Sequence, residues 1–243
     1  AINLCRNRRF LGGNTNGAMA ERITIPASNL LPLPEALSYV NGSLAEPLAV
    51  AIHAIRQAGA LIGKSVLIVG CGPIGLLTLI AARRAGAGCV VMTDVIPKRL
   101  AIARALGAAA ALDPTADNWR AALGEVIHSE RAEVDVAFDA VGVQPTFQQA
   151  IDALRPGGTL IAIGGWRSVN LNLSQLVARE ISLRGTFNFT PAEFADSLNL
   201  LAEGYFDPST LVSSTHAMAD GASVFADLSQ SQADAIKVVL TSG

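Results

Sequence analysis

The hydrophobic positions of this chain form short apolar runs that alternate with longer stretches of helical spacing. Because parallel strands buried on both faces read as continuous β-branched runs, such runs predict strands. The intervening stretches, among them 73–84 and a segment from Pro97 to near Gly107, predict helices. The predicted strands are residues 65–69, 89–93, 109–112, 134–138, 159–163 and 181–186. The alternation predicts an α/β fold with a six-stranded, doubly wound parallel sheet.

The two ends of the chain have a different pattern. Residues 1–44 are rich in turn signals such as Gly12-Gly13-Asn14, and three prolines discourage long helices there. Residues 191–243 predict one helix, a polar stretch and a final strand at 236–240. We therefore expect a central domain at 45–190 that is flanked by two segments of another domain.

Composition narrows the class of protein. A formal net charge of −2 over 243 residues leaves no basic surface for nucleic acid or an anionic membrane. Three scattered cysteines form no disulfide framework, so we expect a cytoplasmic protein. The uncharged stretch 65–82 approaches membrane-spanning length, but its glycines and Pro73 favour a strand, a turn and a helix. The chain starts without Met in mid-pattern, and we expect a fragment.

The most informative motif is Gly70-Cys71-Gly72-Pro73-Ile74-Gly75, which follows a predicted strand and opens a predicted helix. In a dinucleotide-binding loop the first glycine permits the tight turn and the second lets the pyrophosphate approach the backbone. The third allows close packing of helix on strand, and the helix N-terminus attracts the phosphates. The motif predicts a Rossmann domain, although a turn that merely uses glycine is the alternative.

Asp94 ends the next predicted strand, about 20 residues after the loop, where such domains place an acid. Its carboxylate would accept hydrogen bonds from the adenosine ribose and repel a 2′-phosphate, which favours NAD over NADP. The alternative is a helix N-cap before Pro97. Arg99 would flank the adenine or form part of a solvated helix face. A methyltransferase loop for S-adenosylmethionine is disfavoured, because its third glycine usually comes one residue earlier than Gly75.

Three further segments follow the ends of predicted strands, where ligands of open parallel sheets bind. They are Val141-Gly142, Ile163-Gly164-Gly165 and Phe187-Asn188. For Gly142 in particular, a role as turn former alone remains open. We expect all three segments to contact the cofactor.

The glycine loop, Glu46-Pro47 with the apolar run after it, Arg179-Glu180-Ile181 and Gly185-Thr186-Phe187 resemble the zinc-containing medium-chain dehydrogenases. Within them the chain is most similar to the sorbitol and L-idonate 5-dehydrogenase branch. The resemblance implies that the two ends of the chain are remnants of a GroES-like catalytic domain. It also implies a homodimer or homotetramer.

The same resemblance implies an enzyme that oxidises a secondary alcohol of polyol or sugar-acid type by hydride transfer to NAD, with a catalytic zinc as Lewis acid. It makes Cys5 one of four ligands of a structural zinc, and Glu46 a catalytic residue that reaches the catalytic zinc directly or through water. A first-turn acid stabilised by the helix dipole is the alternative for Glu46. The remaining zinc ligands would lie upstream of Ala1.

Asn188 departs from the polyol-oxidising branch, which usually has Arg at that position. An amide has fewer donors than a guanidinium and no charge, so the alcohol is not fixed by the resemblance. Two other functions stay open: an NAD-binding module without catalysis in this chain, and a zinc-free quinone or enoyl reductase. A reductase of that kind would tend to favour NADPH, against which Gly70 and Asp94 argue.

Overall fold

The computed structural model describes residues 2–165, 168–230 and 234–242. The chain forms two compact units. We call Val50–Phe187 the sheet unit. Ala1–Ala49 and Asn188–Gly243 together form the terminal unit.

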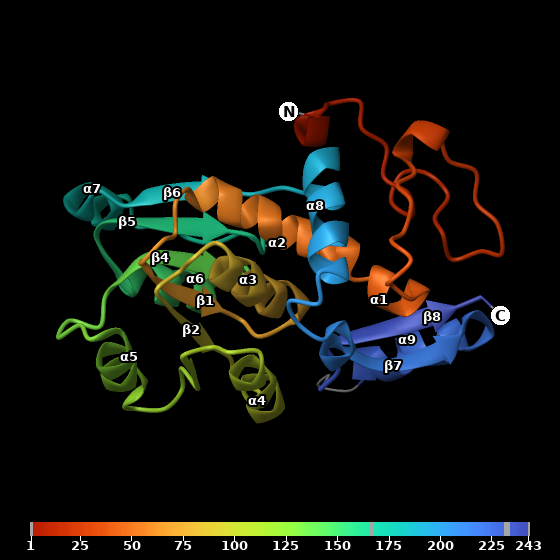
Figure 1. Ribbon diagram of the computed structural model, residues 1–243. Coiled ribbons are helices and arrows are strands. Elements are labelled where there is room, and N and C mark those ends of the chain that lie inside the picture. Colours follow the sequence, from red (N-terminus) through yellow and green to blue (C-terminus); the bar gives the residue numbers. More distant parts are fainter. Residues whose placement is uncertain (1, 166–167, 231–233, 243) are drawn as a thin grey trace. The chain divides into compact units, whose positions relative to one another are not determined.

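Within its described residues, the sheet unit contains a six-stranded parallel sheet with strand order β3-β2-β1-β4-β5-β6 (Figure 1). The strands are β1 (Ser65–Val69), β2 (Cys89–Thr93), β3 (Ala110–Leu112), β4 (Val134–Asp139), β5 (Leu154–Ala162) and β6 (Ser182–Gly185). This order reverses direction between β1 and β4, which is the crevice where doubly wound sheets bind nucleotides. The predicted fold is confirmed.

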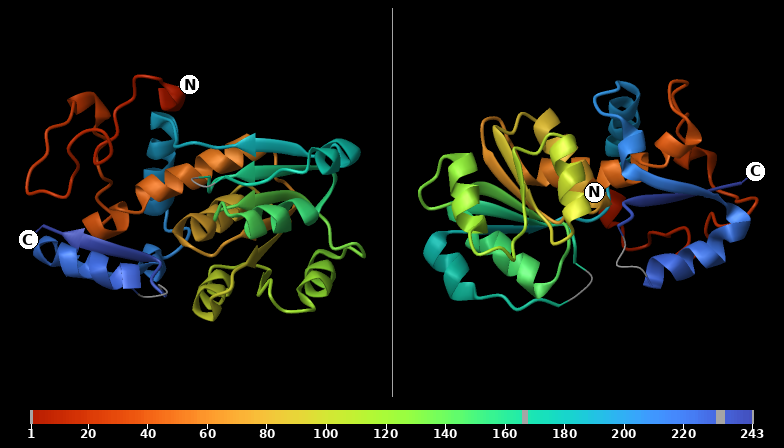
Figure 2. Two further views of the ribbon diagram at one scale, coloured as in Figure 1. Left: turned by 180° about the vertical axis from the view of Figure 1, so that it is seen from behind. Right: turned by 90° about the horizontal axis from the view of Figure 1, so that it is seen from below.

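Helices cover both faces of the sheet (Figure 2, right). They are α3 (Pro73–Arg84), α4 (Pro97–Ala105), α5 (Trp119–Ile127), α6 (Gln144–Asp152), α7 (Leu173–Arg179) and the greater part of α2 (Ala45–Ala58). One core layer joins Leu67 and Leu160 of the strands to Phe147 of α6. Because strand side chains alternate between faces, Ile68 and Phe138 serve the opposite layer, where α3 packs on β1 and β2. Both strand faces are therefore buried, as their apolar runs predicted.

Strand β5 differs most from its predicted bounds, whereas β3, β4 and β6 differ by one residue at one or both ends. β5 begins at Leu154 and not at Thr159, because Leu154 already pairs with Val134 before a register shift. The Pro156-Gly157-Gly158 segment comes before the predicted strand 159–163, but in the structure it lies inside this irregular stretch of β5. β6 forms the edge of the sheet, and all of its residues are exposed.

The terminal unit is made of short elements. They are η1 (Ile2–Leu4), η2 (Ala27–Asn29), α1 (Tyr39–Gly42), α8 (Pro191–Ala202), η3 (Pro208–Leu211), β7 (Val212–Ala217), η4 (Met218–Asp220), α9 (Gly221–Gln230) and β8 (Lys237–Thr241). β7 and β8 pair in parallel as a two-stranded sheet. The final strand was expected, but the intervening segment is wrongly predicted as merely polar, since it contains both β7 and α9. The turn at Gly12-Gly13-Asn14 forms as predicted, and the Asn14 side chain accepts a hydrogen bond from the Phe10 amide at 2.7 Å.

Candidate functional site

The glycine loop joins β1 to α3 with the geometry that its spacing predicts. Gly70 has φ of +98°, a left-handed conformation that side chains other than glycine rarely adopt. A Cβ on Gly75 would lie 1.9 Å from the Gly70 carbonyl oxygen, so the third glycine lets the helix contact the turn directly. Both residues are therefore required by the backbone itself.

Gly72 has a different role, because it faces open space. Apart from Gly72 and its two chain neighbours, no residue that the structure describes places an atom within 4 Å of the position that a Cβ would take there. Gly72 is the N-cap of α3, and no side chain in the described part of the protein caps this helix. The first amides of α3 and its partial positive charge thus have an unobstructed approach. This arrangement fits a phosphate group.

Asp94 connects this loop to the end of β2. Its Oδ2 accepts a hydrogen bond of 2.7 Å from the Cys71 amide, and its Oδ1 accepts one of 2.9 Å from the Ile96 amide. The N-cap of α4 is Ile96, so Asp94 does not have the N-cap role considered as its alternative. Each carboxylate oxygen keeps a further lone pair with which to accept a hydrogen bond from a ligand.

A pocket of about 200 Å³ opens beside Asp94. Among the residues that line it, Gly70, Asp94, Arg99 and Val141 belong to the predicted cofactor site. Sequence reasoning missed its other lining residues, which are Val69, Thr93, Val95, Ile96, Pro114, Thr146 and Gln149. The Gln149 amide donates to the Thr93 hydroxyl at 3.0 Å, which links α6 to the end of β2. No sequence motif marks Gln149. Its place in the pocket can be recognised only when β1, β2 and β4 are known to be neighbours in the sheet.

Asp139, the last residue of β4, organises two of the predicted cofactor segments. Its Oδ1 accepts hydrogen bonds of 3.0 Å from the amides of both Val141 and Gly142. Its backbone oxygen accepts those of Ile163 and Gly164 at 2.9 and 3.0 Å. The residue is fully buried, and this burial raises the pKa of its carboxyl. The hydrogen bonds from the amides of Gly142 and Val141 oppose the shift. Sequence reasoning did not single out Asp139.

The two segments held by Asp139 contact each other through their glycines. A Cβ on Gly142 would lie 2.4 Å from the Gly164 carbonyl carbon, and one on Gly164 would lie 2.4 Å from the Val141 carbonyl carbon. Gly165 has open space around its Cβ position within the described residues. Gly142 and Gly164 are therefore packing glycines, whereas Gly165 leaves room for a ligand.

Cys71, inside the glycine loop, is chemically inert. Burial and the nearby charge of Asp94 raise the pKa of its thiol to about 12, although Arg99 and Arg104 oppose this. At neutral pH the group is a thiol and not a nucleophilic thiolate. The loop therefore offers its backbone, and not this side chain, to a ligand.

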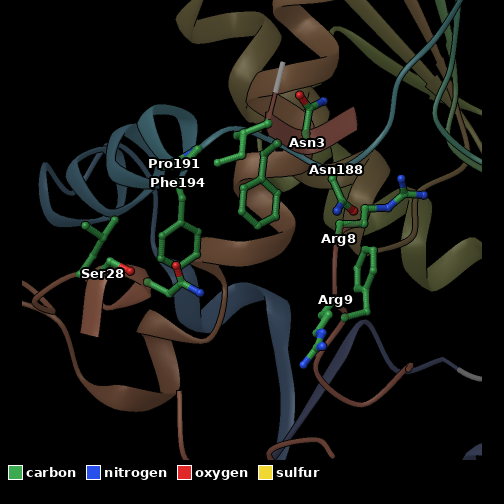
Figure 3. A pocket seen from close by; sticks show the side chains of 12 residues that line it. Asn3, Arg8, Arg9, Ser28, Asn188, Pro191 and Phe194 are labelled. Atoms are coloured by element: carbon green, nitrogen blue, oxygen red, sulfur yellow. The ribbon is translucent and has the colours of Figure 1, made fainter. Parts of the chain in front are cut away.

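Phe187 and Asn188 follow β6, with Phe187 closing the sheet unit and Asn188 opening the next part of the terminal unit. Asn188 has φ of +54°, and Asn is among the few residues that tolerate this conformation. This is a physical reason for Asn at a position where the polyol-oxidising branch usually has Arg. Asn188 lines a pocket of the terminal unit together with Pro191 and Phe194 (Figure 3).

Glu46 lies in the first turn of α2 and is exposed, whereas its neighbours Ala45 and Pro47 are buried. Although the residue as a whole is exposed, the surrounding protein partly desolvates its carboxyl and raises the pKa, and the charge of Lys237 opposes this. The position matches the alternative of a first-turn acid stabilised by the helix dipole.

Cys5 is exposed and outside any disulfide within the described residues. His53 is buried in α2, His128 caps the end of α5, and His216 lies on β7. In the part of the chain that the structure describes, no group of three or more His, Cys, Asp or Glu side chains could hold a metal ion. The described residues alone therefore do not fit a zinc site.

Comparison with known proteins places this geometry in a family. The sequence profile described as "Zinc-binding dehydrogenase" matches residues 73–203. The chain belongs to the zinc-binding dehydrogenase family. No helix in the described residues is both long and apolar enough to cross a membrane.

The relatives include enzymes of sugar acids and diols. The chain is 37% identical over 191 residues to L-idonate 5-dehydrogenase of Vitis vinifera, covering 77% of this chain and 52% of the relative. It is 33% identical over 227 residues to L-idonate 5-dehydrogenase (NAD(P)(+)) of Escherichia coli, covering 90% and 64%. The solved structure of 2R,3R-butanediol dehydrogenase from Bacillus subtilis aligns with TM-score 0.89 and 29% identity, covering 100% and 70%. The chain thus spans less than two thirds of the curated relatives.

Proposed function

We propose that this chain is the NAD-binding part of a dehydrogenase that oxidises a secondary alcohol on a polyol or sugar acid. The observation that carries the proposal is the open approach to Gly72 and the uncapped start of α3, beside the Asp94 carboxylate. A phosphate group needs the open approach and the uncapped helix start, and a ribose diol needs the carboxylate. Family membership supports the same chemistry.

Each segment then has a role of its own. The backbone of Gly72, Ile74 and Gly75 binds the pyrophosphate, with Pro73 setting the start of the helix. Asp94 binds the adenosine ribose, and Arg99 flanks the adenine in the pocket beside it. The bound nicotinamide supplies the hydride acceptor. Ile163-Gly164-Gly165 and Phe187-Asn188 lie near that ring, as the resemblance implies, and Val141-Gly142 contacts the cofactor elsewhere.

We propose that zinc is bound only by a longer protein of which this chain is a part. Glu46 and Cys5 are the residues that this chain would contribute, to the catalytic and the structural zinc respectively. Since the described residues do not complete either site, we derive no chemical step through the metal. The proposal for Glu46 is that its carboxylate orients toward the catalytic zinc, directly or through water.

Cofactor choice tests the proposal. Titration calorimetry of the 243-residue chain should give at least tenfold tighter binding of NADH than of NADPH, because Asp94 repels a 2′-phosphate. Asp94→Ala should remove most of that preference. Asp117→Ala, which removes the same charge from an exposed position, should keep it. Preference for NADPH in the unchanged chain would contradict the proposal and favour the quinone or enoyl reductase.

Turnover separates the enzyme from a second candidate, a cofactor-binding module without catalysis in this chain. That candidate rests on the lack of a metal-holding group among the described residues. NAD reduction should be measured for the 243-residue chain and for the longer protein over a panel of polyols and sugar acids. We expect turnover by the zinc-loaded longer protein alone. Zinc-dependent turnover by the 243-residue chain would rule out the second candidate, a cofactor-binding module without catalysis.

Edge strand β6 supports a further part of the proposal, a homodimer or homotetramer. Its exposed residues leave one row of backbone groups open to pairing with a second copy. Sedimentation velocity should show a dimer or larger species, and a pure monomer would count against the proposed oligomer.

We also propose that the protein acts in the cytoplasm.

A further inference from the structure

The pocket of about 200 Å³ beside Asp94 combines apolar walls with a few polar groups. Val95 and Val141 both line it and are exposed, so they present apolar surface to a ligand. The other aliphatic side chains of the lining are Val69, Ile96 and Pro114. Walls of this kind suit a flat, uncharged ring, and the polar groups then decide which ring is accepted.

Most polar side chains of this lining already have partners. The Asp94 carboxylate accepts hydrogen bonds from two backbone amides, and its remaining lone pairs face the proposed ribose site. Thr146 Oγ1 accepts from the Val143 amide at 3.2 Å and donates to the Val143 carbonyl oxygen at 3.0 Å. Arg99 is engaged as well. These side chains are therefore poorly placed to select a neutral ring.

Gln149 differs from them, because only one end of its side-chain amide is bound. Its Nε2 donates to the Thr93 hydroxyl at 3.0 Å, and Thr93 is buried at the end of β2. Among the described residues, no hydrogen bond reaches the Oε1 of Gln149. An amide oxygen only accepts hydrogen bonds. The pocket thus holds one neutral acceptor whose capacity is unused.

We propose that Gln149 selects the base of the cofactor, with its Oε1 accepting a hydrogen bond from the exocyclic amine of adenine. Thr93 is then a positioning residue, since its hydroxyl holds Nε2 and so turns Oε1 toward the base. This inference rests on the proposed function, which places adenine in this pocket, and it adds the residue that distinguishes adenine from other purines.

Hypoxanthine is the purine that this arrangement should reject. It carries a carbonyl oxygen where adenine carries the amine, so two acceptors would face each other across the pocket. Turning the Gln149 amide over would bring Nε2 to the base, but Nε2 would then leave the Thr93 hydroxyl. Because a polar group enclosed without its partner is costly, either arrangement should weaken binding.

Two matched pairs of ligands test this selectivity without turnover. NADH and reduced nicotinamide hypoxanthine dinucleotide differ only in the base. Titration calorimetry of the 243-residue chain should show about tenfold tighter binding of NADH. The second pair, 5′-AMP and 5′-IMP, repeats the comparison without the nicotinamide half and should show the same preference for adenine.

Variants of one helix locate the effect. Gln149→Leu should reduce the ratio of the two dinucleotide affinities to less than about twofold, because no acceptor then distinguishes the bases. Gln148→Leu removes the same side chain from the neighbouring position of α6, outside this lining, and should keep the ratio.

The role of Thr93 has its own pair of variants. Thr93→Val should lower the ratio, because Nε2 loses its acceptor and either edge of the amide can then face the base. Thr93→Ser restores a hydroxyl and should restore the ratio. A ratio that is unchanged in Thr93→Val would show that Thr93 does not position the amide.

Equal binding of the two dinucleotides by the unchanged chain would overturn the proposal, and so would an equal fall of the ratio in Gln148→Leu and Gln149→Leu. The first comparison needs no variant and decides the matter even if Gln149→Leu does not fold. NADH binding without base preference would leave the proposed function intact. Preference for AMP over IMP without NADH binding would overturn that function and retain the role of Gln149. Failure of all four ligands to bind would overturn both.

Discussion

The two units of this protein are built from the chain in different ways. The sheet unit uses one continuous stretch, and its central strands are buried on both faces. The terminal unit joins the two ends of the chain, and its strand β7 alternates between half-buried and exposed positions. It also exposes large apolar side chains such as Met19 and Tyr39. A nucleotide site can be predicted from the first kind of sequence, whereas a site in the second depends on segments that are remote along the chain.

The largest expected effect separates two glycines of the same loop. Gly75→Ala places a methyl group against the Gly70 carbonyl oxygen and should lower the free energy of unfolding of the sheet unit by about 3 kcal/mol. Urea denaturation followed by circular dichroism measures the change. Gly72→Ala is the matched control.

Gly72→Ala meets open space at a negative φ, so it should lower the free energy of unfolding by less than about 1 kcal/mol. NADH binding should nevertheless weaken about tenfold, because the methyl group occupies the approach of the phosphate. Equal destabilisation by both substitutions would contradict the distinction between packing and ligand-facing glycines.

The region around these glycines also shows which parts of the structure the sequence predicts and which it does not. The bounds of β1, α3 and β2 agree with their predictions, because a buried strand followed by a glycine turn has an unambiguous pattern. β7 and α9 were missed, since Ser and Thr dilute the apolar periodicity of the segment. Asp139 was missed for another reason: its importance lies in hydrogen bonds to two different loops, and only strand order brings these together.

An intermediate effect is expected at Asp139. Asp139→Leu leaves the amides of Val141 and Gly142 without their acceptor and should lower the free energy of unfolding by about 2 kcal/mol. Asp139→Asn keeps an oxygen in the same place and should retain the loop. Urea denaturation of both variants checks this difference, and equal losses would contradict the role of the Oδ1 acceptor.

The raised pKa of Asp139 adds a pH dependence. A carboxyl with a raised pKa in the folded state stabilises the fold fully below its unfolded pKa and loses that contribution as pH rises through the folded pKa. Asparagine does not titrate. The stability of Asp139→Asn relative to the unchanged chain should therefore increase from pH 4 to pH 7. A constant difference between the two proteins would contradict a raised pKa.

A smaller, local effect is expected in the terminal unit, at the start of α8. Thr190 caps this helix by accepting from the Glu193 amide at 3.4 Å, and the Glu193 carboxylate accepts from the Thr190 amide at 2.7 Å. Thr190→Ala should lower stability by about 1 kcal/mol, and Thr190→Ser should restore it. Amide hydrogen exchange of α8 measures the local change. Faster exchange in the sheet unit as well would show that the two units do not open independently.

The four amides gathered by Asp139 have a kinetic consequence. Because Val141, Gly142, Ile163 and Gly164 are already tied to one buried residue, we expect these loops to rearrange little if a cofactor binds there as proposed. Association should then be governed by diffusion and orientation, and the lifetime of the complex should set its affinity. If the chain binds the cofactor as proposed, we expect one bound nucleotide to be replaced by another at the rate at which the first dissociates.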